Sequence, residues 1–77
     1  MIKQGFGSTQ HRKFRVMETI IDLHTKPNDK SNVVIAVHNG AVLLLENEIN
    51  DIWLEVLYKT VGKAISGYTK REFLEEL

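Results

Sequence analysis

The side chains of this chain best suited to binding chemistry are three aromatic rings in its second half. Trp53, Tyr58 and Tyr68 each combine a large apolar ring with one polar atom, which favours use at binding surfaces. Two interpretations of Trp53 stay open: a partly exposed platform for a ligand, or a cover over one end of the protein core. The tyrosines predict an extension of the same aromatic groove, with core packing as the alternative for each.

Polar residues in two loops form a second group of candidate contacts. One loop spans 26–31, and another charged segment, 46–51, is expected to form an acidic tip. Loops on a rigid scaffold commonly carry recognition, although most charged loops are only solvated. An acidic tip favours basic partners and disfavours nucleic acid. Besides the three aromatic residues, the predicted ligand-binding residues are His24, Lys26, Asn28, Asp29, Glu48 and Asp51.

The sequence gives no pattern for catalysis, a metal or a cofactor. His11, His24 and His38 lack the spacing of zinc ligands. The hydroxyls and carboxylates form no nucleophile elbow, and no Gly-rich phosphate loop precedes a helix. We therefore expect no catalytic residue, no metal site and no cofactor, and interpret the chain as a non-enzyme.

Short Val/Ile/Leu-rich runs that alternate with turn residues must position these side chains. The pattern predicts an all-β protein, with five strands in a small barrel. The expected strands are 15–24, 32–37, 41–45, 52–58 and 63–69. The expected turns are 26–31, 39–40, 46–51 and 59–63.

Three local features refine this expectation. Asn39-Gly40 predicts a tight hairpin turn with positive φ values. Thr69 and Glu72 have the spacing of a capping box, which predicts one short C-terminal helical turn. That turn would bring Phe73 and Leu74 onto the core.

Alternation also predicts which side chains face the core. The inward residues are expected to be Val42, Leu44, Ile52, Leu54, Val56 and Tyr58. The outward apolar residues are then Leu43, Leu45 and Leu57. Such a surplus suggests burial by the N-terminal segment or by a second copy, so a homodimer through a strand edge is one open alternative.

Charge is distributed unevenly, although the formal net charge is zero. Residues 16–77 carry six Lys/Arg and ten Asp/Glu, a net of 6 − 10 = −4. We predict a flexible basic arm over 1–15 and a barrel domain over 16–77, with Phe6 and Phe14 able to pin the arm. Four basic residues can make only a few contacts to phosphate, so a nucleic-acid partner is a third and weaker hypothesis. The basic residues of the arm are Lys3, Arg12, Lys13 and Arg15.

Six short segments, in order, resemble the bacterial SH3-like (SH3b) family over about residues 18–75. The resemblance implies an SH3-like barrel and a non-catalytic role. Members of that family bind peptidoglycan or its cross-bridge peptides, and others bind proteins. The segments are Ile21-Asp22-Leu23-His24-Thr25-Lys26-Pro27, Val33-Val34, Gly40, Trp53-Leu54-Glu55-Val56, Gly62-Lys63 and Gly67-Tyr68-Thr69 followed by Phe73-Leu74.

The chain departs from the family pattern at three positions. His24 replaces a usual Arg, Lys26 a frequent Gly, and Tyr68 a frequent Trp. Loss of the Arg removes a planar bidentate donor, which a histidine does not replace. The primary hypothesis is a module that recognises a protein or peptide through an aromatic groove; the alternative is a cell-wall targeting module.

Location follows from the same alternatives. The sequence has no cysteine, and it lacks both a secretory signal at its start and the ~20 apolar residues of a membrane span. We expect a cytoplasmic protein if Met1 is the true start. As part of a lysin or an exported parent protein, it would be cell-wall-associated.

Overall fold

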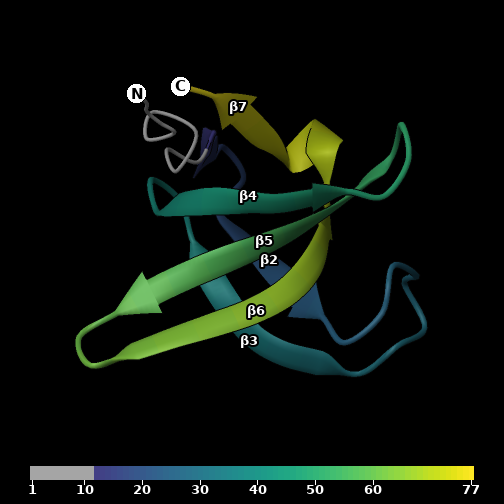
Figure 1. The fold of residues 1–77 in the computed structure, drawn as a ribbon, viewed down its shortest axis with the longest axis horizontal. Helices are drawn as coiled ribbons and strands as arrows, with labels where there is room; N and C mark the ends of the chain where they lie inside the picture. The colour runs from purple at the N-terminus through teal and green to yellow at the C-terminus, as the bar shows by residue number, and fades with distance from the viewer. Residues whose placement is uncertain (1–11) are drawn as a thin grey trace, which may run out of the picture.

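The protein is all-β in the computed structural model, which describes residues 12–77 (Figure 1). Its strands are all antiparallel, and no helix among the described residues is long and apolar enough to cross a membrane. The elements are β1 (Lys13–Val16), β2 (Ile20–His24), β3 (Val33–His38), β4 (Val42–Glu48), β5 (Trp53–Thr60), β6 (Lys63–Lys70), the 3-10 turn η2 (Arg71–Phe73) and β7 (Leu74–Glu76).

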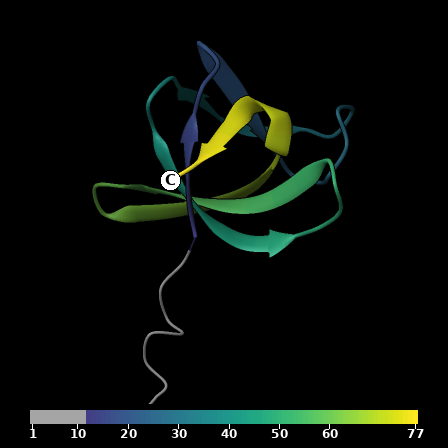
Figure 2. The ribbon, with the colours of Figure 1, turned by 90° about the horizontal axis from the view of Figure 1, so that it is seen from above.

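The seven strands form one strongly curved sheet in the order β3-β2-β6-β5-β4-β1-β7. Figures 1 and 2 show the sheet curling around its concave side. The sheet is not closed, because β3 and β7 are its two edges, so the expected five-stranded closed barrel is not confirmed. The core inside the curve contains Phe14, Val16, Ile21, Leu23, Val37, Leu43, Leu54 and Val56.

Strand β1 corrects the expected boundary of the N-terminal arm at residue 15. Phe14 and Val16 are buried and alternate with exposed Lys13 and Arg15, so this segment has the pattern of a half-buried strand. It pairs with both β4 and β7. Phe14 therefore attaches the segment to the core, as expected. Lys3 and Phe6 lie outside the described residues.

The expected first strand, 15–24, is in fact two strands. A corner at residues 17–19 separates β1 from β2, and the two strands then pair with different neighbours. Since β2 continues as far as His24, the loop over 26–31 lies where the sequence predicts it.

The turn at Asn39-Gly40 is not the expected hairpin turn. Gly40 has a φ of +88°, but no non-glycine residue described has a positive φ, so Asn39 does not. The amide of Ala41 donates to the His38 carbonyl at 3.2 Å. Strands β3 and β4 then diverge to pair with β2 and β1.

The inward and outward assignments of β4 were wrong. Leu43 is fully buried and Leu45 packs against the core, whereas Val42 is 44 % exposed. Strand β1 accounts for this, because Phe14 lies directly opposite Leu43 and both side chains are buried in the core. Strand β4 also continues through Glu48, with a register shift after Leu45, so the first half of the expected acidic tip, residues 46–48, is strand.

The C-terminal segment forms a single 3-10 turn, η2, followed by the edge strand β7. No α-helical turn forms and no side chain caps η2, so the capping box of Thr69 and Glu72 is wrong. Thr69 instead belongs to β6. Phe73 and Leu74 do pack against the core. On β5, Leu54 and Val56 face the core as expected, but Ile52 lies before the strand and is 57 % exposed.

Gly67 allows β6 to approach β2 closely at Leu23. A Cβ built on Gly67 would lie 2.8 Å from the Cβ of Leu23 on β2. Real Cβ atoms do not approach that closely, so any side chain here forces β2 and β6 apart.

We predict that Gly67→Ala lowers the free energy of unfolding by about 3 kcal/mol, the upper end of the cost of overpacking. Gly40→Ala is the control, because its Cβ would meet nothing within 4 Å. Strain from its positive φ should cost only about 1–2 kcal/mol. Urea unfolding measures both changes, and a smaller loss for Gly67→Ala than for Gly40→Ala would contradict the close-approach argument.

Candidate functional site

A groove opens where β2 separates from β6. Strand β2 pairs with β3 along its whole length, but it pairs with β6 only at His24 and Tyr68. From Ile20 to Leu23, the second edge of β2 has no strand partner among residues 12–77. The cavity beside this edge, here called the β2 groove, has a volume of about 340 Å³.

Trp53 forms one end of the β2 groove. It is only 8 % exposed, so the expectation of a partly exposed platform is corrected towards a ring that mostly covers the core. The His24 ring meets the indole edge to face, with ring centres 5.9 Å apart. The ammonium of Lys70 lies 5.7 Å from the centre of the indole ring, within the range of a cation–π contact.

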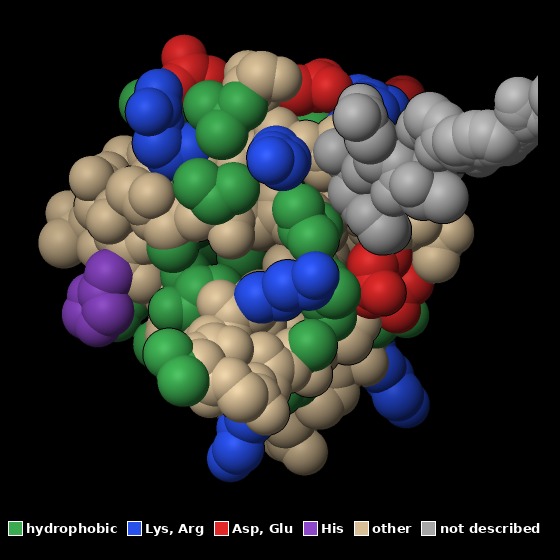
Figure 3. All heavy atoms as spheres, turned by 60° about the vertical axis from the view of Figure 1, so that its left-hand side comes forward, with side chains coloured by type: hydrophobic (Ala, Val, Ile, Leu, Met, Phe, Trp, Pro, Cys, Tyr) green, Lys and Arg blue, Asp and Glu red, His purple; other side chains and the backbone are tan. Residues whose placement is uncertain are grey.

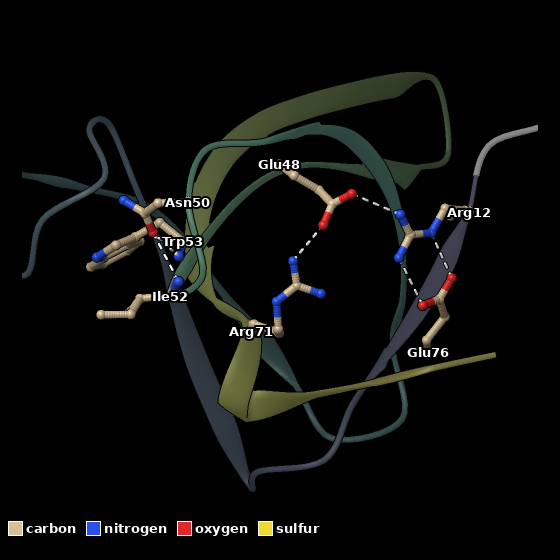
Figure 4. A network of polar contacts seen from close by, with 7 residues as sticks. All are labelled: Arg12, Glu48, Asn50, Ile52, Trp53, Arg71 and Glu76. Carbon is tan, nitrogen blue, oxygen red and sulfur yellow. Dashed lines mark hydrogen bonds and ion pairs between the residues drawn. The ribbon is translucent and has the colours of Figure 1, made fainter.

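Asn50 fixes the backbone of Trp53 (Figure 4). Its Oδ1 accepts hydrogen bonds from the amides of Ile52 and Trp53, both at 2.8 Å. The Trp53 carbonyl in turn accepts a bond from the amide of Ile49 at 3.0 Å. A short side-chain amide that bonds to the next backbone amides is typical of a turn. Trp53 is therefore held where β5 begins.

The loop over 26–31 reaches the groove through Asp29. The Asp29 carboxylate pairs with Lys70 at 2.9 Å, which joins the loop to the end of β6. The other predicted residues of this loop lie elsewhere. Asn28 accepts a bond from the Lys30 amide at 3.0 Å and so stabilises the turn. Lys26 is exposed and does not line the groove.

His24 is held by the last residue of that loop. Its Nδ1 lies 3.1 Å from the Ser31 carbonyl oxygen. The Ser31 hydroxyl lies 2.9 Å from the Lys26 carbonyl and 2.8 Å from that of Asn28. These contacts within the loop orient the imidazole towards Trp53.

Thr69 belongs to the lining of the groove and is its most buried polar residue. It is 1 % exposed, and its Oγ1 has no hydrogen-bond partner among residues 12–77. An unpaired buried hydroxyl costs free energy, and most native structures satisfy such groups. This hydroxyl is therefore available to a group that enters the groove.

Two carboxylates line the groove on the side of β2. Glu18 lies just before the strand, and Asp22 lies within it. Both are exposed, and neither has an ion-pair partner within residues 12–77. Together with Asp29 they outnumber the one cation of the lining, Lys70.

Tyr68 lies beside a second, smaller pocket on the far side of His24. This pocket has a volume of about 260 Å³ and includes Glu55 and Ser66. The Glu55 carboxylate, followed by partial burial, raises the pKa of the Tyr68 phenol. Tyr58 packs against the core instead. The structure thus places His24 at both pockets, beside Trp53 in the β2 groove and beside Tyr68 in the smaller pocket, and packs Tyr58 against the core.

Glu48 takes part in an ion-pair network and is not a free acidic residue (Figure 4). Arg12 contacts both oxygens of Glu76, at 2.6 and 2.9 Å, and also Glu48 at 2.9 Å. The second oxygen of Glu48 lies 2.6 Å from Arg71. These bonds lower the pKa of both carboxyls: Arg71 and then Arg12 act on Glu48, and Arg12 acts on Glu76.

Asp51, the last predicted contact, lies outside the β2 groove. It lines a shallow pocket with Ile52 and with residues 70–72. The acidic tip expected from the sequence is therefore divided between an ion-pair network and an exposed loop.

Figure 3 views the molecule from the side of the β5–β6 hairpin, and on that face single Lys and Arg side chains stand between hydrophobic ones.

Ile20, Asp22, Thr69 and Lys70 line the groove but were not predicted as contacts. Ile20 and Asp22 lie on the same face of β2 as His24, a predicted contact, so the period of two in a strand could have placed them there. The positions of Thr69 and Lys70 could not be predicted in this way, because the sequence around them also fits the start of a helix. The place of Asn50 follows from its common use in turns.

Comparison with protein-family models, curated proteins and solved structures finds no match to this chain.

We predict that Thr69→Val raises the free energy of unfolding by about 1 kcal/mol, because it removes an unpaired buried hydroxyl with little change in shape. Thr60→Val is a matched control at an exposed strand position, where the change should stay within about 0.5 kcal/mol. Thermal and urea unfolding measure both. Loss of stability in Thr69→Val would show that the hydroxyl has a partner.

We also predict that the Arg12 network is lost in acid. Folding lowers the pKa of Glu48 and Glu76 below the usual value of 4.5. The stabilisation is therefore complete above that value and disappears as the pH falls through the lowered pKa. Arg12→Gln should reduce the melting temperature at neutral pH by a few degrees and make no difference in strong acid. Lys13→Gln, a neighbouring exposed cation, is the control; an equal effect of both variants at neutral pH would contradict the prediction.

Proposed function

We propose that this domain is a non-catalytic binding module that takes an extended protein or peptide segment in the β2 groove. The observation that carries the proposal is the edge of β2 that is left unpaired by the strands of residues 12–77, beside a cavity lined by a nearly buried tryptophan. An extended segment can add to such an edge with main-chain hydrogen bonds, while its side chains enter adjacent pockets.

The size and lining of the groove support a segment of polypeptide over a larger organic ligand. Its volume of about 340 Å³ is at the low end for small-molecule sites. Ile20, Trp53 and Phe73 supply apolar contact, and Thr69 supplies a hydroxyl without a partner. This combination fits one or two side chains of a chain that continues along β2.

The test selects peptides from a random displayed library against the immobilised protein. Ile20 is 49 % exposed and lines the groove, so Ile20→Ser should leave the fold intact and weaken the selected peptides by about tenfold or more. Val61→Ser is the matched control, since Val61 is fully exposed at the tip of the β5–β6 hairpin. The fluorescence of Trp53, the only tryptophan, reports binding.

Amide chemical shifts locate the bound peptide. Shifts confined to β2, η2 and the end of β6 are expected. Peptides that bind Ile20→Ser as tightly as the native protein and shift other residues would overturn the proposal.

The cell-wall alternative is an outcome of the same design. Purified peptidoglycan replaces the peptides in a sedimentation assay with the same two variants. Co-sedimentation that Ile20→Ser abolishes and Val61→Ser preserves, together with a failure to select peptides, would assign the groove to the cell wall instead.

A further inference from the structure

We propose that the group recognised in the β2 groove is a cation, the ammonium or guanidinium of a lysine or arginine side chain in the bound segment. This inference rests on the proposed function and specifies its ligand.

The lining has an excess of negative charge that the other residues of 12–77 do not neutralise. Lys70 pairs with Asp29 at 2.9 Å, and this is the ion pair that the structure describes across the groove. The carboxylates of Glu18 and Asp22 remain without a cation within residues 12–77. An incoming cation would pair with them, whereas an anion would be repelled.

Lys70 shows that an ammonium fits beside the indole. Its Nζ lies 5.7 Å from the centre of the Trp53 ring while its other contact is the Asp29 carboxylate. The Asp29 side chain is 67 % exposed, so this ion pair is weakly held and open to exchange. A second cation can therefore share the carboxylates of the groove or replace Lys70.

Thr69 provides the second, independent sign of a ligand. An ammonium donates three hydrogen bonds and a guanidinium five, so a bound cation needs acceptors of different orientation. The carboxylates supply some, and the unpaired Oγ1 of Thr69 supplies a neutral one at a buried position. The hydroxyl, which has no partner among residues 12–77, thereby gains one in the complex.

The experiment uses one series of blocked peptides, Ac-Val-Thr-Xaa-Thr-Val-NH2, in which Xaa is Lys, Arg, Gln, norleucine or Glu. Their affinities for the full chain are measured from amide shifts and Trp53 fluorescence. The Lys and Arg peptides should bind about tenfold more tightly than the Gln and norleucine peptides. The Glu peptide should be the weakest, and added salt should reduce the preference for a cation.

Matched variants assign the preference to the groove. Asp22→Asn should remove most of the advantage of Lys over Gln, whereas Asp51→Asn, which changes the net charge equally at an exposed position outside the groove, should preserve it. Thr69→Val should weaken the Lys peptide severalfold while stabilising the fold, a combination that unfolding cannot produce.

The outcomes separate the two proposals. Equal binding of the norleucine and Lys peptides, with shifts in the groove, would overturn the cation and leave the extended segment in place. A Lys peptide that binds Asp22→Asn or Thr69→Val as tightly as the native protein would also overturn it. Absence of groove shifts with every peptide of the series and with every selected peptide would overturn both.

Discussion

Gly67 lies so close to Leu23 that an added Cβ would come within 2.8 Å of the Leu23 Cβ, and the shape of the molecule depends on that contact. The approach lets β6 pair with β2 at His24 and Tyr68. Because the sheet is strongly curved and η2 turns the chain away after Lys70, the pairing does not continue along β2. One residue without a side chain thus both joins the two halves of the sheet and determines where the β2 groove begins.

Trp53 depends on this arrangement in a second way. It lies opposite Lys70 at the start of the long β5–β6 ladder, and Asn50 holds its backbone from the preceding turn. The ring is then flanked by His24 from β2 and by the ammonium of Lys70 from β6. Three separate elements must be in place before the indole can form the end of the groove, so the site is a product of tertiary structure.

The sequence predicted the strand content and most turns, because alternation and turn residues are local properties. Trp53, His24 and Asp29 were also recognised as candidate contacts, and the structure places all three at the groove. Their types and positions next to expected loops were sufficient for that. The phase of β4 could not be read from its sequence, since five consecutive apolar residues, 41–45, contain no alternation.

The features that the sequence did not predict depend on contacts between residues far apart in the chain. Strand β1, whose Phe14 is paired with Leu43 and buried with it in the core, sets the phase of β4. The basic residues around Phe14 made that strand resemble a solvated arm. The prediction of an acidic tip over 46–51 was wrong for the same reason, a contact between residues far apart in the sequence. Glu48 is separated by 36 residues from Arg12, its partner in the network, so its pairing has no local signal.

From Ile20 to Leu23, one edge of β2 has no strand partner among residues 12–77, and the charged side chains there oppose unwanted pairing. An open strand edge can pair with any other strand and so promotes aggregation, which native proteins oppose with charges on or near the edge. Glu18 and Asp22 occupy such positions, and Asp22 is exposed on the strand itself. The same carboxylates that repel an acidic strand, and that would lose their hydration against an apolar one, would attract a segment with a well-placed cation. Selectivity in the proposed complex therefore arises from a repulsive element, because segments without the cation would leave the carboxylates desolvated and unpaired.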